Sequence, residues 1–166
     1  KPILREHLRD MLLMVTPHRH AFDAPAMLEE VRFNREKLLI AEDNELNAEI
    51  LKTLLESRNL SVVWAENGKV AAERFAESEP GEYAAILMDV RMPVMDGLEA
   101  TRRIRGMTRE DARCIPIFAL SANAFADDIQ RSLQCGMNTH FNKPVDMDSI
   151  CAALHYWLEH DKGNRS

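Results

Sequence analysis

From residue 37 onward, the chain alternates short apolar runs with stretches whose apolar residues recur at helical spacing. The apolar runs are residues 38–41, 60–65, 83–88, 115–120 and 139–141, and a last amphipathic helix is expected over residues 146–159. Strands that are separated by helices in this way form a parallel sheet with helices on both faces. The alternation therefore predicts an α/β fold with a doubly wound, five-stranded parallel sheet.

Residues 1–36 do not follow this alternation. Residues 1–15 have the apolar spacing of an extra N-terminal helix, and residues 16–36 contain two prolines and are interpreted as a linker. A Lys-Pro pair followed by an amphipathic helix occurs both at residue 1 and at residue 143, at one constant offset. This short repeat predicts that residues 1–15 are the last helix of a preceding sister domain. Because its apolar face would lack a sheet, the helix is expected to pack on this domain or to pair two copies as a homodimer.

The expected division is thus a helix over 1–15, a linker over 16–36, a domain over 37–160 and a tail over 161–166. A net charge of −6 and a pI near 5.5 argue against binding to a nucleic-acid backbone. No apolar run is long enough to span a membrane, so no direct membrane contact is expected of this segment. Three cysteines without CxxC spacing favour reduced thiols in the cytoplasm. An anchor in the inner membrane, in another part of the parent protein, is compatible with this location.

Charged and hydroxyl side chains stand where four of the predicted strands end. Glu42 and Asp43 follow the first strand, Asp89 follows the third, Ser121 the fourth, and Lys143 the fifth. In open parallel sheets, ligands bind outside the carboxyl ends of the strands. Three carboxylates, one hydroxyl and one ammonium group are therefore expected to lie together at one edge of the sheet.

This set of side chains suits the chemistry of phosphate. Three neighbouring carboxylates repel one another, at a cost of about 1.4 kcal/mol for each unit by which a pKa rises, and a divalent cation removes that cost. Oxygen ligands without His or Cys suit Mg²⁺. The cation, Lys143 and Ser121 would then hold a phosphoryl group, with Asp89 as the natural nucleophile.

Four segments with these residues resemble the successive motifs of bacterial response-regulator receiver domains, in particular those of hybrid sensor histidine kinases. They are LLIAEDNELNAEIL, ILMDVRMPVMDGLEATRRIR, FALSANAF and GMNTHFNKPV, and the resemblance covers residues 37–160. It implies a flavodoxin-like fold with strand order 2-1-3-4-5. It also implies a two-component phosphorelay, in which a histidine kinase, in the same chain or in a separate one, donates a phosphoryl group and a histidine phosphotransfer protein is a further partner.

The resemblance also assigns roles to residues by their position. The roles are Asp89 as phosphoacceptor, Asp43 as direct Mg²⁺ ligand, Glu42 as a ligand mainly through water, the backbone carbonyl of Arg91 as a further ligand, and Ser121 and Lys143 as contacts of the phosphoryl oxygens. The domain would catalyse its own phosphorylation and dephosphorylation, whereas the parent protein would be the kinase. An output surface is expected over residues 125–134, 139–141 and 147–157.

Three positions depart from the common pattern of the family. Glu42 stands where aspartate is common, and Ser121 stands where threonine is frequent. His140 occupies the switch position, where a tyrosine or phenylalanine is usual. The resemblance implies that phosphorylation would draw Ser121 inward and let His140 follow, although an imidazole is smaller than those rings and titrates near neutral pH.

Two alternatives from other functional classes remain open at this point. One is a pseudo-receiver that binds partners without being phosphorylated. The other is a phosphatase of the haloacid-dehalogenase type, which also uses a strand-end aspartate, Mg²⁺ and a lysine. Such a phosphatase needs an acid two residues after the nucleophile, and that position holds Arg91. The phosphatase is therefore the weaker alternative.

Overall fold

The computed structural model describes residues 33–122 and 125–164 of the chain. Its sheet has five parallel strands in the order β2-β1-β3-β4-β5, which confirms the predicted fold and strand order. The strands are β1 (Lys37–Ala41), β2 (Ser61–Ala65), β3 (Tyr83–Asp89), β4 (Ile117–Ser121) and β5 (Thr139–Asn142). All of their carboxyl ends therefore lie at the same edge.

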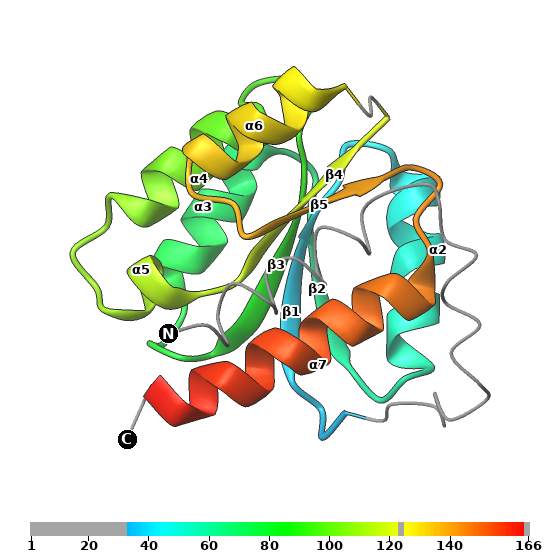
Figure 1. Cartoon of the computed structure of the whole chain (residues 1–166), viewed down its shortest axis with the longest axis vertical. Helices are drawn as coiled ribbons and strands as arrows, with labels where there is room; N and C mark the ends of the chain where they lie inside the picture. Colours follow the sequence, from blue (N-terminus) through cyan, green and yellow to red (C-terminus); the bar gives the residue numbers. More distant parts are fainter. Residues whose placement is uncertain (1–32, 123–124, 165–166) are drawn as a thin grey trace.

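Helices cover both faces of this sheet (Figure 1). They are α2 (Glu45–Glu56), α3 (Gly68–Glu77), α4 (Gly97–Arg105), α5 (Asp111–Cys114), α6 (Ala126–Gln134) and α7 (Met147–Asn164). The sequence pattern did not predict the short α5, because four residues are too few to show helical periodicity. Helix α7 continues past the expected end near residue 159 and into the segment interpreted as a tail.

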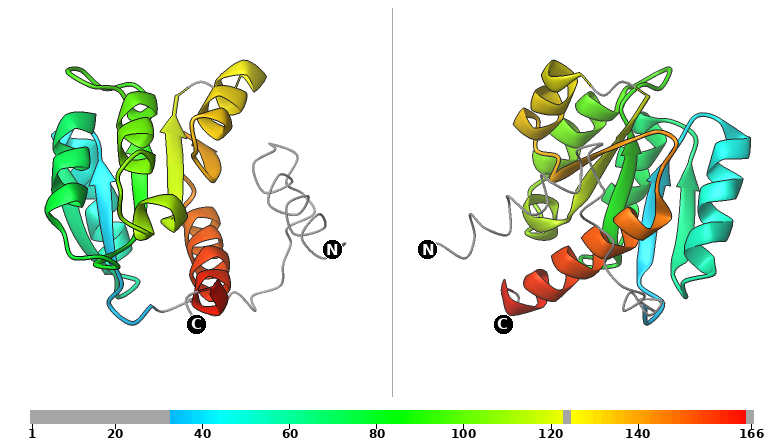
Figure 2. Two further views of the ribbon diagram at one scale, coloured as in Figure 1. Left: turned by 90° about the vertical axis from the view of Figure 1, so that its left-hand side faces the viewer. Right: turned by 45° about the vertical axis from the view of Figure 1, so that its right-hand side comes forward.

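The central strand β3 is buried on both sides, and its side chains alternate between two cores. Ile86 and Met88 face the core under α3 and α4, together with Phe75 and Ile104. Leu87 faces the core under α2 and α7, which includes Leu38, Leu55, Phe118 and Leu154. In Figure 1, α3, α4, α5 and α6 lie on one side of the sheet, and α2 and α7 lie on the other. Figure 2 shows the same domain from two further directions, with α6 in yellow and α7 in orange to red.

Asparagine and aspartate side chains begin three of the helices directly after the strands. The side chains of Asn44, Asn67 and Asp96 accept hydrogen bonds from backbone N–H groups in the first turns of α2, α3 and α4. Such caps satisfy N–H groups that have no partner within the helix. The caps of α2 and α3 keep the connections from β1 and β2 to these helices short.

Helix α4 begins against the end of β3 because Gly97 has no side chain. A Cβ atom at this position would lie 2.2 Å from the carbonyl oxygen of Asp89. The Gly97 N–H donates a hydrogen bond of 2.9 Å to the carbonyl oxygen of Val90. The loop between β3 and α4 is thereby folded back onto the strand end.

The apolar residues of α2 lie on two stripes, and only one of them enters the core. Leu51 and Leu55 are buried, whereas Leu46, Ile50 and Leu54 are 68%, 52% and 43% exposed. At α6, the N-cap residue Phe125 and Leu133 also face outward, since they are 72% and 42% exposed. The helices are therefore where their spacing predicted them, but part of their apolar surface faces outward.

The packed domain begins before residue 37. Phe33 is buried, and its N–H donates a hydrogen bond of 3.1 Å to the carbonyl oxygen of Arg58. Residues 33–36 thus pack on the domain, although the sequence pattern assigns them to a linker. The predicted helix over 1–15 and the rest of that linker lie outside the described residues. Within the described part of the chain, no helix is long and apolar enough to cross a membrane.

Candidate functional site

The carboxyl edge of the sheet brings four of the predicted site residues into one place. Asp89 and Ser121 are the last residues of β3 and β4, Glu42 follows β1, and Lys143 follows β5. Glu42, Asp89 and Ser121 are buried, with exposed fractions of 2%, 5% and 4%. The sequence prediction of their convergence is correct, because parallel strands end at the same edge.

Lys143 lies between two of the carboxylates. Its Nζ atom is 2.8 Å from Oε2 of Glu42 and 2.9 Å from Oδ2 of Asp89. Partial burial lowers the pKa of Lys143, but the hydrogen bonds and negative charges of Asp89 and Glu42 outweigh this effect and leave its pKa above the usual value. Lys143 is therefore a fixed positive charge at neutral pH.

The two buried carboxylates are not fully compensated by this one lysine. Burial raises the pKa of Glu42, and the negative charge of Asp89 raises it further. Hydrogen bonds from Lys143 and from the N–H of Asn44, which lies 3.1 Å from Oε1, lower it only in part. The net pKa of Glu42 is above its ordinary value, so the site favours an additional positive charge.

Three carboxylates are placed so that they can share a cation. One oxygen from each of Glu42, Asp43 and Asp89 lies within 4.8 Å of the other two. Asp43 is exposed, whereas the other two are buried, so the group opens toward solvent on one side. An all-oxygen donor set with one open side fits Mg²⁺, which binds few protein carboxylates and keeps several waters.

The loop after β3 contacts the carboxylate of Asp89. The N–H of Arg91 lies 3.2 Å from Oδ1 of Asp89 and donates a hydrogen bond to it. Asp89 therefore accepts hydrogen bonds on both oxygens, from Arg91 and from Lys143. The role of the Arg91 carbonyl as a metal ligand stays a prediction.

Ser121 and Lys143 are coupled through the backbone. The N–H of Lys143 donates a hydrogen bond of 2.8 Å to the carbonyl oxygen of Ser121, which joins the ends of β4 and β5. This bond fixes the lysine and the serine relative to each other. The contact of the serine hydroxyl with a phosphoryl group stays a prediction.

His140 does not join the carboxylate cluster. It lies on β5 beside Ala119 of β4, is buried, and its Nδ1 atom lies 3.4 Å from Oγ of Ser132 on α6. The imidazole thus lies between the sheet and α6. Its role as a switch stays a prediction. Because the imidazole contacts Ser132, a movement of His140 would act on α6.

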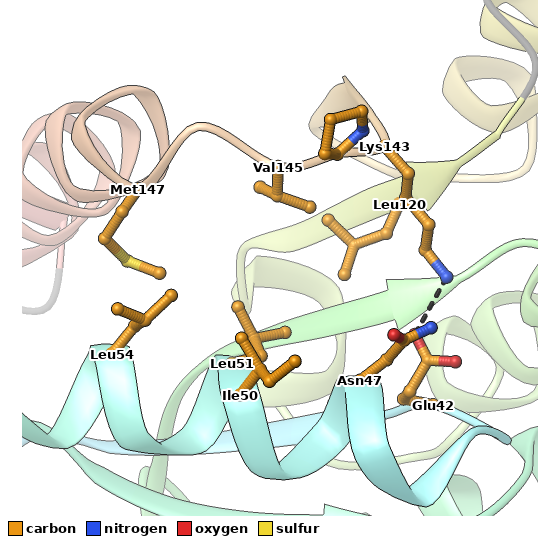
Figure 3. Close-up of a pocket in the computed structure, with 10 residues that line it drawn as sticks. Glu42, Asn47, Ile50, Leu51, Leu54, Leu120, Lys143, Val145 and Met147 are labelled. Atoms are coloured by element: carbon orange, nitrogen blue, oxygen red, sulfur yellow. Dashed lines mark hydrogen bonds and ion pairs between the residues drawn. The ribbon is translucent and has the colours of Figure 1, made fainter.

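An apolar groove of about 490 Å³ adjoins this site, and the sequence pattern did not predict it (Figure 3). Ile50, Leu51 and Leu54 of α2 form one wall, and Val145 and Met147 face them from the segment before α7 and its first residue. Glu42 and Lys143 lie at one end. A signal was present in the sequence, since five apolar residues on α2 are more than one buried face needs.

Trp64, which the sequence pattern did not indicate as a site residue, contacts the backbone of the acidic pair Glu42–Asp43. The indole N–H of Trp64, on the edge strand β2, donates a hydrogen bond of 2.8 Å to the backbone carbonyl of Glu42. A tryptophan in a continuous apolar strand such as SVVWA is usually a packing residue, so nothing in the sequence distinguishes it.

Comparisons with known proteins find a family model and relatives that match most of this chain. The family model of the response regulator receiver domain matches residues 38–155. Hybrid signal transduction histidine kinase I of Dictyostelium discoideum is 38% identical over 113 residues, which are 67% of this chain and 6% of that protein. The autoinducer 2 sensor kinase/phosphatase LuxQ of Vibrio vulnificus is 36% identical over 129 residues, which are 75% of this chain and 14% of that protein. The chain thus spans a small part of these relatives.

Two solved structures are similar in both sequence and fold. The receiver domain of a sensor histidine kinase from Pseudomonas aeruginosa, with a magnesium ion coordinated in its active site cleft, is 36% identical with a TM-score of 0.67, over 75% of this chain and 98% of that one. A receiver domain from Saccharomyces cerevisiae, bound to a histidine phosphotransfer protein, is 31% identical with a TM-score of 0.66, over 75% of this chain and 90% of that one.

Proposed function

The chain belongs to the response regulator receiver domain family, and on that premise we propose that Asp89 accepts a phosphoryl group from a phosphohistidine. One observation carries this proposal: Asp89 ends the central strand with Lys143 on one carboxylate oxygen and two further acids within reach of the same cation. A buried aspartate that is surrounded in this way is poised for attack on phosphorus, not for a structural ion pair alone.

We propose Mg²⁺ as the cofactor, held by Asp43, Asp89, the backbone carbonyl of Arg91 and, mainly through water, Glu42. The ion would neutralise negative charge on the transferring phosphoryl group. The carboxylate oxygens within 4.8 Å of one another and the raised pKa of Glu42 support this assignment. The magnesium ion in the similar Pseudomonas aeruginosa domain supports it as well.

In the transfer, a carboxylate oxygen of Asp89 attacks phosphorus and forms an acyl phosphate. The bond between phosphorus and the imidazole nitrogen of the donor breaks, and that nitrogen keeps the electron pair. Lys143 remains beside the product as a positive charge, and the hydroxyl of Ser121 donates a hydrogen bond to a phosphoryl oxygen. His140 then follows Ser121, and the movement reaches α6 through Ser132, which lies against the imidazole.

The chain is proposed to act in the phosphorelay of a hybrid sensor histidine kinase, with a histidine phosphotransfer protein as partner. The two hybrid or sensor kinases that it resembles and the yeast complex support this role. The setting would be the cytoplasm, where the three free thiols stay reduced. The proposal concerns the domain, and the kinase activity is expected elsewhere in the parent protein.

The partner that carries the phosphohistidine is proposed to dock on the apolar groove beside α2. Leu46, Ile50 and Leu54 recur every fourth residue on the exposed side of α2, so together they form a stripe that a second helix can cover. The groove ends at Glu42 and Lys143 (Figure 3). A helix seated on it would hold its histidine next to Asp89.

The first test is intact mass after incubation with acetyl phosphate and Mg²⁺, for the wild type and Asp89→Asn. The wild type is expected to gain one phosphoryl group and the variant none, because asparagine lacks the nucleophilic oxygen. EDTA should abolish the gain in the wild type. Equal labelling of the variant would contradict the assignment of Asp89.

A second arm of this test distinguishes the pseudo-receiver alternative. A phosphorylated histidine phosphotransfer protein is offered as donor, since some acceptors respond only to their protein donor. Transfer to the wild type supports the proposed function. Binding of the donor without transfer would instead favour a module that recognises partners without phosphorylation.

A further inference from the structure

We propose that Trp64 is a positioning residue that holds the Glu42–Asp43 pair in place for Mg²⁺. This inference rests on the proposed function, because it concerns the affinity of the same metal site. Trp64 supplies no ligand; it acts on the backbone from which two of the acids extend.

Both peptide groups of Glu42 are bound to β2. The Glu42 N–H donates a hydrogen bond of 3.1 Å to the carbonyl oxygen of Ala65, and the Glu42 carbonyl accepts one of 2.8 Å from the indole of Trp64. The pairing of β1 with β2 ends at Ala41 and Ala65, one residue before Glu42. The indole therefore continues the bonding of the sheet past the point where the strands stop.

The carbonyl that accepts from Trp64 belongs to the peptide group between Glu42 and Asp43. A peptide group is planar, so fixing its carbonyl also fixes the direction in which Asp43 begins. The side chain of Glu42 is held separately by Lys143 and by the N–H of Asn44. Asp43 is exposed, and the indole bond restrains the backbone immediately before it.

The same segment of β2 and α3 also braces the other half of the metal site. The N–H of Gly68 donates a hydrogen bond of 3.1 Å to the carbonyl oxygen of Met95, in the loop that includes Arg91. A Cβ atom at Gly68 would lie 2.5 Å from that oxygen, so the contact is close. Residues 64–68 thus touch both segments from which the proposed ligands come: Trp64 contacts the Glu42 segment through its side chain, and Gly68 contacts the loop with Arg91 through its backbone.

The chain contains a second tryptophan that provides a matched control. Trp157 on α7 packs against the second core and the ring of Tyr156, and its indole nitrogen has no hydrogen-bond partner among the described residues. Trp157→Phe therefore removes a ring without removing a hydrogen bond. Trp64→Phe removes both.

The experiment measures the dissociation constant for Mg²⁺ by isothermal titration calorimetry in the wild type, Trp64→Phe and Trp157→Phe. A fourth protein carries benzothienylalanine in place of Trp64 in the Trp157→Phe background. This residue keeps the shape of tryptophan but has sulfur in place of the N–H group. Thermal unfolding of each protein in EDTA shows whether it is folded.

Trp64→Phe and the benzothienylalanine protein are expected to bind Mg²⁺ about three- to tenfold more weakly, the effect of one hydrogen bond between neutral groups. Trp157→Phe should stay within twofold of the wild type. Wild-type affinity in the benzothienylalanine protein would overturn the proposal, because the ring alone would then suffice. If the wild type is labelled on Asp89 and Trp64→Phe binds Mg²⁺ as tightly as the wild type, the inference is overturned and the proposed function stays intact. A wild type without Mg²⁺ binding would overturn both.

Discussion

At the scale of single residues, the site depends on one lysine that serves two buried acids. Lys143 contacts Glu42 and Asp89 at 2.8 and 2.9 Å, and its side chain is 25% exposed. Glutamate in place of the more common aspartate gives the first acid an extra methylene with which to reach the ammonium group. The lysine thereby stabilises both buried carboxylates.

Lys143→Met is expected to lower the free energy of unfolding by roughly 2 kcal/mol at pH 7 in EDTA, because two buried carboxylates lose their cation. The pKa of Glu42 already lies above its ordinary value of 4.5 and would rise further. A raised acid pKa means that the folded state binds more protons, so stability falls as pH rises from 4.5 through the folded pKa. The loss should therefore shrink toward pH 4.5, as urea unfolding across this range would show.

The matched control is Lys69→Met, because Lys69 forms an exposed pair of 3.9 Å with Glu73 on α3. Exposed pairs contribute little, so its effect should stay within about 0.5 kcal/mol at every pH. In the wild type, the raised pKa of Lys143 means that its contribution is complete below its ordinary value of 10.5 and is lost as pH rises through the folded pKa. A pH-independent loss in Lys143→Met would contradict this account.

At the scale of the elements, the apolar residues of α2 form two stripes, and we assign a separate role to each. Leu51 and Leu55 hold the helix on the sheet, and the stripe of Leu46, Ile50 and Leu54 lines or adjoins the groove. Because the stripes are distinct, the outer one can be changed without opening the core. The proposed docking role of α2 can therefore be separated from its structural role.

Ile50→Glu is expected to slow transfer from a phosphorylated histidine phosphotransfer protein by tenfold or more, because a buried charge at the interface is costly. Labelling by acetyl phosphate should change less than twofold, since this small donor needs no docking surface. The measurement is the initial rate with each donor. Leu133→Glu on α6 is the control, because Leu133 is similarly exposed but lies on another helix and does not line the groove. Equal slowing by both variants would contradict docking on α2.

At the scale of the whole molecule, the acids at the sheet edge are expected to make the stability of the domain depend on the proposed Mg²⁺ ion. Mg²⁺ at ten times its dissociation constant should add about 1.4 kcal/mol, which raises the melting temperature by about 3–6 °C for a domain of this size. Thermal unfolding with Mg²⁺ and with EDTA measures this shift. Asp43→Asn removes one charge of the exposed ligand and should lose most of it, and an undiminished shift would place the ion elsewhere.

The sequence by itself determined the architecture and the chemical content of the site. Short apolar runs that alternate with helical stretches are sufficient to predict a parallel sheet, because strands buried on both faces must be continuously apolar. Such a sheet places Glu42, Asp89, Ser121 and Lys143 at one edge, whatever the details of packing.

Only the tertiary structure decided which surfaces meet. The sequence did not distinguish Leu51, which is 8% exposed, from Ile50, which is 52% exposed, because that depends on how α2 is rotated against the sheet. The indole of Trp64 reaches hydrogen-bond distance of the Glu42 carbonyl because β1 and β2 pair, and His140 contacts Ser132 because α6 packs on the sheet. These contacts join residues that are apart in the chain, so local patterns carry no record of them.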